Sequence, residues 1–167
     1  MMTLKRILVA TDFGEAADSA LAYGRELART FGAQLDVLHV ADNVFAHAVS
    51  ADGFVATYPA IQADIEEAAR AELNRIVSGE DRAVLGARTI IRVSATPALA
   101  IIDYAREANI DLIVIGTHGR GAMAHLLMGS VAERVVRTAP CPVLTVRHPE
   151  HEFVHPDALV AVSRARQ

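Results

Sequence analysis

Short runs of apolar residues alternate along this chain with longer segments whose apolar residues recur every three or four positions. This alternation limits the folds open to the chain more than any other feature. The runs are too short for helices, and DLIVIG at residues 111–116 is almost wholly apolar, which is typical of a strand covered on both faces. We therefore predict strands over residues 4–10, 34–40, 88–93, 111–116 and 143–146.

The segments between these runs predict helices. The first has one small apolar face, made of Ala17, Ala20, Leu21, Gly24, Leu27, Ala28 and Phe31, and we expect it to stop at Gly32. A second amphipathic segment runs from Ile61 to about Gly79. Residues 42–58 between them show no clear period and predict a loop, with room for a short helix.

Two further helices are expected in the second half of the chain. Thr96 and Pro97 suit the N-cap and first position of a helix that reaches about Ala108. Its inward-facing residues are predicted to be Leu99, Ile102 and Ala105. A shorter helix is expected to begin near residues 129–130 and to end before Pro140.

Strands that alternate with helices predict an α/β fold, in which right-handed crossovers join the strands of a parallel sheet. A length of 167 residues fits one domain. Ligands of such sheets bind outside the carboxyl ends of the strands, at the point where the strand order reverses. Here that edge is expected to hold residues 10–12, 39–42, 93–94 and 116–119.

Composition excludes several functions. Lys5 is the single lysine and is not preceded by glycine, which argues against a P-loop and against Schiff-base chemistry. A net charge of −4 argues against nucleic acid as a partner. No secretory signal is visible and no apolar run approaches the ~20 residues that cross a bilayer, so we expect a cytoplasmic protein that does not enter a membrane. Cys141 is the single cysteine, and we expect it to be a small buried apolar residue.

The glycine-rich segment after the fourth predicted strand points to an anion. It reads GTHGRGAMAHLLMGS over residues 116–130 and connects a strand to a helix. Backbone amides in such a loop, and the free amides of the following helix, can bind phosphate without a lysine. The glycines could equally serve only as tight turns, and composition alone does not separate the two interpretations.

The spacing Gly-x2-Gly-x9-Gly-Ser after DLIVIG resembles the ATP-binding branch of the universal stress protein family. Other segments match in the same order: ILVATDFGEAADSAL, LHV, GSVAERVV and APCPVLTVR. The likeness covers nearly all of residues 4–147. It implies a Rossmann-like open parallel five-stranded sheet of the adenine nucleotide alpha hydrolase type, with helices on both faces. It also implies a family domain over residues 1–147 and a C-terminal extension over residues 148–167, for which fraying is favoured over a docking arm.

The resemblance also implies a nucleotide site. Asp12 matches the residue on the ribose or adenine side, and Val40 matches the one whose backbone contacts the adenine edge. Ala10 stands beside the base, where the branch often has proline. The loop around ribose and phosphates is matched by Ile115, Gly116, His118 and Gly119, and the phosphate-holding segment by Gly129, Ser130 and Val131. Any Mg²⁺ would be held mainly by phosphate oxygens, and family members commonly form homodimers near residues 143–146.

Alternative roles remain open for several of these residues. Asp12 could be simply an N-cap of the first helix. His118 and His125 could be surface or turn residues, and His148, His151 and His155 are more readily explained as surface residues than as a metal cluster. A dinucleotide fingerprint at residues 119–124 is a poor match, because it does not follow the first strand.

Two function classes follow. The favoured one is a dimeric module that binds ATP, or another adenine nucleotide, in stress response and regulates an unidentified protein partner. The alternative is a slow Mg²⁺-dependent ATPase, for which His118, Arg120 and Asp12 offer groups but no assigned base. No residue is therefore assigned a catalytic role, and no metal-binding side chains are expected.

Overall fold

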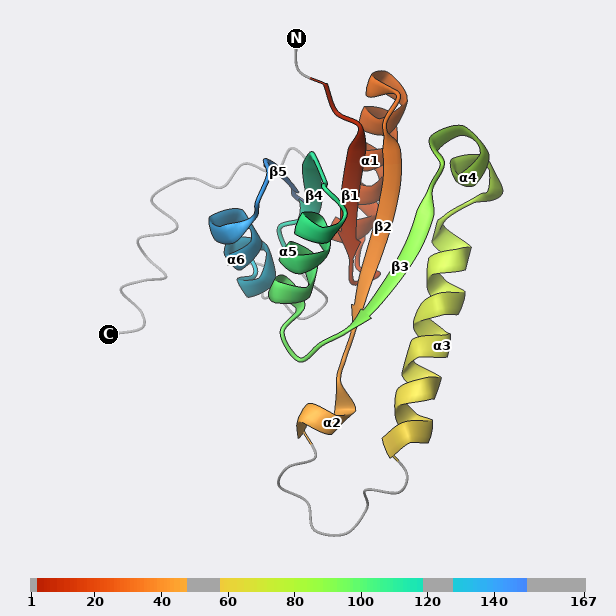
Figure 1. The fold of residues 1–167 in the computed structure, drawn as a ribbon, viewed down its shortest axis with the longest axis vertical. Helices are drawn as coiled ribbons and strands as arrows, with labels where there is room; N and C mark the ends of the chain where they lie inside the picture. The colour runs from red at the N-terminus through yellow and green to blue at the C-terminus, as the bar shows by residue number, and fades with distance from the viewer. Residues whose placement is uncertain (1–2, 48–57, 119–127, 150–167) are drawn as a thin grey trace, which may run out of the picture.

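A computed structural model describes residues 3–47, 58–118 and 128–149 of the chain. It contains one sheet of parallel strands: β1 (Arg6–Thr11), β2 (Gln34–Ala41), β3 (Arg88–Val93), β4 (Leu112–Gly116) and β5 (Val143–Val146). Their order is β3-β2-β1-β4-β5 (Figure 1). The strand order reverses between β1 and β4, and this confirms the predicted open, doubly wound sheet.

The helices form a layer on each face of the sheet (Figure 1). One layer holds α1 (Glu15–Phe31), which packs on β1 and β4, together with α3 (Tyr58–Ile76) on β2 and β3, and α4 (Gly79–Leu85) against α1. The other layer holds α5 (Pro97–Glu107) and α6 (Ser130–Thr138), which pack on each other. The short α2 (Val44–His47) contacts α3 beyond the carboxyl end of β2. No helix in these described ranges is long and apolar enough to cross a membrane.

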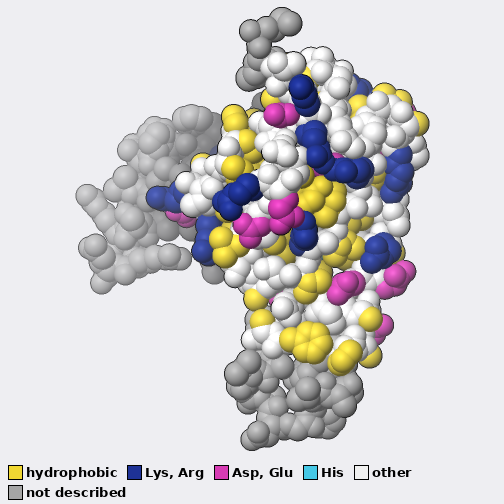
Figure 2. Space-filling view, viewed as in Figure 1, with side chains coloured by type: hydrophobic (Ala, Val, Ile, Leu, Met, Phe, Trp, Pro, Cys, Tyr) yellow, Lys and Arg dark blue, Asp and Glu magenta, His cyan; other side chains and the backbone are white. Residues whose placement is uncertain are grey.

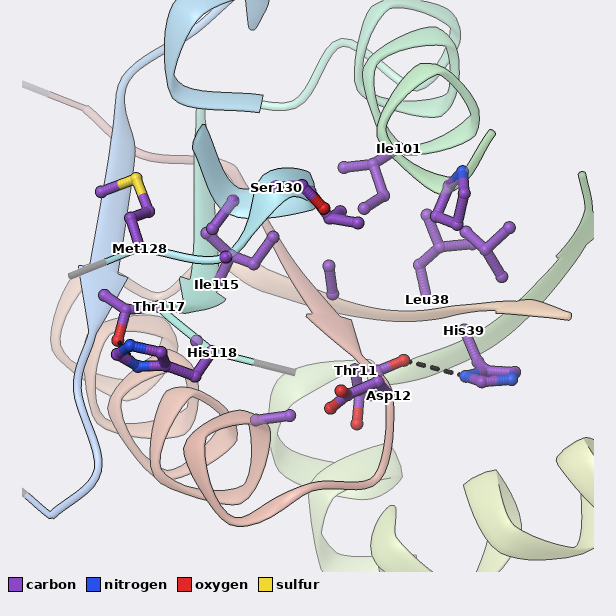
Figure 3. Close-up of a pocket in the computed structure, with 18 residues that line it drawn as sticks. Thr11, Asp12, Leu38, His39, Ile101, Ile115, Thr117, His118, Met128 and Ser130 are labelled. Atoms are coloured by element: carbon purple, nitrogen blue, oxygen red, sulfur yellow. Dashed lines mark hydrogen bonds between the residues drawn. The ribbon is translucent and has the colours of Figure 1, made fainter. Parts of the chain in front are cut away.

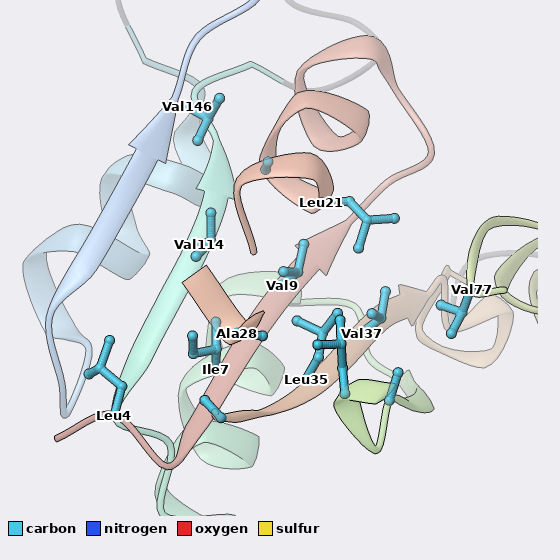
Figure 4. Close-up of a cluster of buried hydrophobic side chains, with 14 of the residues drawn as sticks. Leu4, Ile7, Val9, Leu21, Ala28, Leu35, Val37, Val77, Val114 and Val146 are labelled. Carbon is cyan, nitrogen blue, oxygen red and sulfur yellow. The ribbon is translucent and has the colours of Figure 1, made fainter. Parts of the chain in front are cut away.

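Alternate side chains of a strand point to opposite faces of the sheet, as its pleat requires, and pack into two separate cores. Ile7 and Val9 of β1 point toward α1, in a cluster with Leu35 and Val37 of β2 (Figure 4). Leu8 of β1 points the other way, into a cluster under α5 and α6. Because both faces are covered, residues 7–10 of β1 and 112–115 of β4 are unbroken apolar runs, as predicted for the fourth strand.

The ends of α1 follow from its sequence. Gly32 adopts φ 63° at the C-cap, a left-handed conformation in which glycine carries no Cβ penalty, and this confirms the predicted stop. Gly14, not Asp12, occupies the N-cap. Phe31 was expected on the buried face of the helix but is 39% exposed.

Two helix predictions need correction, and the predicted N-cap of α5 is confirmed. The second predicted helix ends at Ile76, and a separate α4 begins at Gly79 with a capping box between Ser78 and Asp81. Thr96 is the N-cap of α5, but its side chain makes no capping hydrogen bond. Leu99 was expected to face inward and is 44% exposed, whereas Ile101 is buried together with Ile102 and Ala105.

Candidate functional site

A cavity of about 470 Å³ lies outside the carboxyl ends of β1 and β4, where the strand order reverses. Its walls come from the strand ends, the β1–α1 turn and the first turns of α5 and α6. In Figure 3, Ile101 and Ser130 lie on the α5 and α6 side, and Asp12 and His118 lie on the α1 side. A parallel sheet is expected to bind its ligand at this position.

The predicted site residues that the structure describes all line this cavity. They are Ala10, Asp12, Val40, Ile115, Gly116, His118, Gly129, Ser130 and Val131. Gly119, the remaining predicted residue, lies outside the described residues, as do His125, His151, His155 and the chain beyond residue 149. The structure therefore brings residues from four distant segments to one place, while their contacts with a ligand stay a prediction.

One wall of the cavity is apolar. Leu38 and Val40 come from β2, Pro97 and Ile101 from α5, and Met128 from the segment before α6. Leu38 and Ile101 are 1% and 3% exposed, so they form a packed and preformed surface. A flat apolar ring fits such a wall better than a charged group would.

The start of α6 forms the part of the lining next to Ile101 (Figure 3). The first hydrogen bond of this helix runs from the Glu133 amide to the Gly129 carbonyl, so the amides of Ser130, Val131 and Ala132 have no acceptor within the helix. Gly129 is the N-cap and has no side chain that could accept from them. Its φ of −71° and ψ of 155° are open to every residue, so the backbone conformation does not require glycine here.

The position of Asp12 is set by the β1–α1 turn. Its Oδ1 accepts a hydrogen bond from the Gly14 amide at 3.0 Å, which fixes the carboxylate at the mouth of the crevice. The prediction that Asp12 could be the N-cap of α1 is therefore wrong, although its side chain does bond to the N-cap residue. A carboxylate held in this way suits hydrogen bonds from the hydroxyls of a sugar.

His118 follows the end of β4. Its Nδ1 lies 2.9 Å from the Thr117 hydroxyl, and Thr117 is buried, with its amide donating to the Val146 carbonyl. The Thr117 carbonyl in turn accepts from the Gly129 amide. These bonds connect the ends of β4 and β5 to the start of α6 and hold Thr117 and Gly129 together beside the crevice.

Gly116 has a structural reason to be glycine. A Cβ placed on it would lie 2.8 Å from the carbonyl carbon and 2.9 Å from the Cβ of Ala16 in α1. Such distances are far below ordinary van der Waals contact, so β4 and α1 can approach this closely only when residue 116 has no side chain. The spacing of glycines in the sequence could not separate this packing role from a ligand role.

Several lining residues were not predicted as site residues. Thr11, His39 and Thr117 lie at the predicted edge of the sheet, but nothing in the sequence singled them out. The α5 residues Pro97 and Ile101 were missed because the predicted inward face included Leu99 instead of Ile101, although its other members, Ile102 and Ala105, are buried as predicted. Pro97 and Ile101 are four residues apart and so lie on one face of the helix, and this spacing was the available signal.

The described residues do not form a metal centre of their own. Within residues 3–47, 58–118 and 128–149, no group of three or more His, Cys, Asp or Glu side chains is placed to hold an ion. Asp12 is the carboxylate among the lining residues. Cys141 lies apart from the cavity lining, and burial, followed by the charge of Asp111, raises the pKa of its thiol. It is therefore a poor nucleophile near neutral pH.

An open parallel sheet with this strand order, and a crevice at its switch point, defines a Rossmann-like α/β protein. The chain matches the profile of the Universal stress protein family over residues 3–147, and it belongs to that family.

Individual relatives agree with this assignment. A universal stress protein of Thermus aquaticus is 36% identical over 147 residues, covering 86% of this chain and 98% of the relative. The solved structure of the hypothetical protein MJ0577 superposes with a TM-score of 0.75 at 26% identity, over 89% of this chain and 99% of its own. A universal stress protein of Archaeoglobus fulgidus in complex with dAMP gives a TM-score of 0.59 at 25% identity, over 87% and 99%.

Proposed function

We propose that this chain is a regulatory module that binds ATP, or another adenine nucleotide, in stress response, rather than an enzyme. The observation that carries the proposal is the cavity at the switch point, whose lining combines an apolar wall with a helix start that has no side-chain cap. These two surfaces suit the two ends of a nucleotide. The dAMP complex of the Archaeoglobus fulgidus relative supports an adenine nucleotide as the ligand class.

The base would lie against Leu38, Pro97 and Ile101, with the backbone of Val40 at its edge. Main-chain groups of a strand end can donate to and accept from the edge of a purine without a dedicated side chain. Asp12, fixed by its bond to Gly14, would accept from the ribose hydroxyls. The apolar residues bind the ring, while the backbone and Asp12 orient it.

The phosphates would lie at the start of α6. The amides of Ser130, Val131 and Ala132 point out of the helix, and the positive end of the helix dipole favours negative charge. The Ser130 hydroxyl lies on the same wall and would add a donor. Mg²⁺ fits this arrangement as an ion held mainly by phosphate oxygens, since Asp12 alone supplies a carboxylate to the lining.

The regulatory role includes a homodimer and a protein partner. In the described part of the sheet, β5 lies at one edge and pairs with β4 alone, and a second β5 could extend the sheet there. The face shown in Figure 2 has acidic and basic side chains interspersed, which with a net charge of −4 favours protein over nucleic acid as the partner. A ligand made inside cells implies a cytoplasmic location. Sedimentation equilibrium tests the dimer, and a monomer at every concentration would refute it.

Release of small molecules from the purified protein tests the ligand directly. Mass spectrometry of the released material is expected to detect an adenine nucleotide. Added ATP with Mg²⁺ is expected to stabilise the fold by about 2.7 kcal/mol at a hundredfold excess over Kd. Comparison of ATP, ADP and AMP by calorimetry would show whether the third phosphate contributes to affinity. The proposal is refuted if the protein releases no nucleotide and its melting temperature does not change with ATP, ADP or AMP.

Gly129→Val tests the phosphate end. The backbone at Gly129 accepts a side chain, so the fold should tolerate valine while the branched side chain occupies the space proposed for phosphate. We expect nucleotide uptake to be lost with little change in stability. Gly79→Val is the matched control, because a Cβ at Gly79 meets nothing within 4 Å and α4 lies away from the cavity. Unchanged uptake by the Gly129 variant would remove this residue from the site.

Steady ATP turnover would instead favour the slow ATPase. Asp12, His39 and His118 are the titratable side chains that line the crevice, and each has a hydrogen-bond partner within the protein. Turnover by the pure protein that disappears in Asp12→Asn or His118→Ala, while ATP binding persists, would establish hydrolysis. We expect no such turnover.

A further inference from the structure

The turn that carries Asp12 contains a strained residue. Phe13 has φ 63°, a left-handed conformation that is unfavourable for a residue with a bulky side chain. Glycine would adopt it at no steric cost, yet the chain has phenylalanine between Asp12 and Gly14. Such strain persists only where the surrounding structure holds it in place.

Two local hydrogen bonds hold the turn from within. The Phe13 amide donates to the Thr11 hydroxyl at 3.0 Å, and the Gly14 amide donates to the Asp12 carboxylate at 3.0 Å. Both are short-range bonds of the kind that Thr and Asp form in isolated turns. The first ties the turn to Thr11, the last residue of β1, and neither bond reaches the neighbouring strand β2.

His39 adds a connection from the neighbouring strand β2. It stands opposite Thr11 in the register of β1 and β2, and its Nδ1 lies 2.9 Å from the Thr11 carbonyl oxygen (Figure 3). A carbonyl can only accept, so Nδ1 is the protonated nitrogen and donates this bond. The same imidazole stacks on the Phe13 ring, with the two centroids 4.3 Å apart and the planes 28° from parallel.

We propose that His39 is a positioning residue for the nucleotide: it holds the β1–α1 turn in its strained form, and thereby places the Asp12 carboxylate. This inference rests on the proposed function. The hydrogen bond of His39 fixes the residue before Asp12, and its ring fixes the residue after it. One side chain of β2 thus constrains both neighbours of Asp12, which itself faces the cavity.

His39 also lines the cavity, so a direct contact with the ligand is the competing explanation. The two explanations predict different energetics. A direct contact contributes independently of Asp12, so the losses from changing both residues add. A residue that acts through Asp12 loses its effect on affinity once the Asp12 contact has been removed.

The first experiment uses the protein without ligand. In His39→Leu, hydrogen exchange of the Phe13 and Gly14 amides is expected to be about three- to tenfold faster, which is the equilibrium effect of one net hydrogen bond. Amides of the β1 core, such as that of Val9, should exchange as in the wild type. His39→Asn keeps a donor at the position of Nδ1 and should restore most of the protection. Unchanged exchange at Phe13 and Gly14 in His39→Leu overturns the inference.

The second experiment is a double-mutant cycle on ATP affinity. Asp12→Asn keeps the acceptor for the Gly14 amide and removes the charge, while His39→Leu loosens the turn. We expect each single variant to bind about tenfold more weakly and the double variant to bind no worse than Asp12→Asn. Additive losses would show direct contact by His39 and overturn the positioning role. If the wild type binds no nucleotide, the proposed function and the positioning role both fail, whereas the exchange result still decides whether His39 holds the turn.

Discussion

The contact between Gly116 and α1 predicts the effect of a single methyl group. In Gly116→Ala the new Cβ would meet the carbonyl carbon, the Cβ and the oxygen of Ala16 at 2.8, 2.9 and 2.9 Å. Two of these atoms belong to the backbone of a helix, so they cannot rotate away as the end of a flexible side chain could. The strain must instead move α1 away from β4.

The magnitude follows from the cost of overpacking. Forcing a methyl group into a filled interior costs about 1–3 kcal/mol, and backbone neighbours place this case in the upper half of that range. For a domain of this size, a loss of about 2 kcal/mol lowers the melting temperature by roughly 4–8 °C. Because α1 begins next to Asp12, the shift should also weaken nucleotide binding.

Urea unfolding followed by circular dichroism measures this loss. Gly79→Ala is the control, since the same change there meets open space at the start of α4 and should stabilise the fold by a few tenths of a kcal/mol. Equal stability of Gly116→Ala and wild type would contradict the packing argument. Loss of nucleotide binding with unchanged stability would instead show that residue 116 must be glycine to leave space for the ligand.

Two further side chains outside the cavity give predictions. Burial alone would raise the pKa of Asp81, but hydrogen bonds from Arg25 and Ser78 lower it below its ordinary 3.8. Asp81→Asn should therefore lower the free energy of unfolding by about 1–3 kcal/mol at pH 7. This loss should vanish as the pH falls through the lowered pKa, because the wild-type carboxylate then becomes protonated. A loss that stays constant down to pH 2 would refute this. Because the pKa of Cys141 is raised by burial and by Asp111, its reaction with a thiol reagent at pH 8 should be slower than that of free cysteine; an equal rate would refute it.

Much of the fold was predictable from the sequence because its main signals are local. The strand runs at residues 88–93 and 143–146 match β3 and β5 to the residue. Gly32 and Pro97 mark helix ends through backbone rules that need no knowledge of the rest of the chain. The strand ends then predict the edge where the described site residues meet, since the carboxyl ends of parallel strands share one edge.

The remaining features depend on partners far apart in the chain. The seven-residue α4 was missed because it has little apolar period, although Ser78 and Asp81 form its capping box. Asp36, inside the apolar run of β2, is fully buried and accepts hydrogen bonds from Arg6, Arg88 and Tyr104. Three different elements provide these donors, and no local pattern reveals them. The inward face of α5 is likewise set by how the helix lies on β2, and periodicity alone predicted Ile102 and Ala105 correctly but Leu99 wrongly.

Gly116 and Gly129 show that a glycine pattern in the sequence does not by itself separate packing from ligand binding. The two look equivalent in the sequence, because each lies at one end of the segment between β4 and α6. In the structure, Gly116 is glycine because α1 leaves no space for a Cβ, whereas the backbone at Gly129 would accept any residue. At Gly129 neither the backbone conformation nor a side-chain capping bond accounts for the glycine, and the adjoining amides of α6 favour an anion. The case for a nucleotide therefore depends on the second glycine more than on the first.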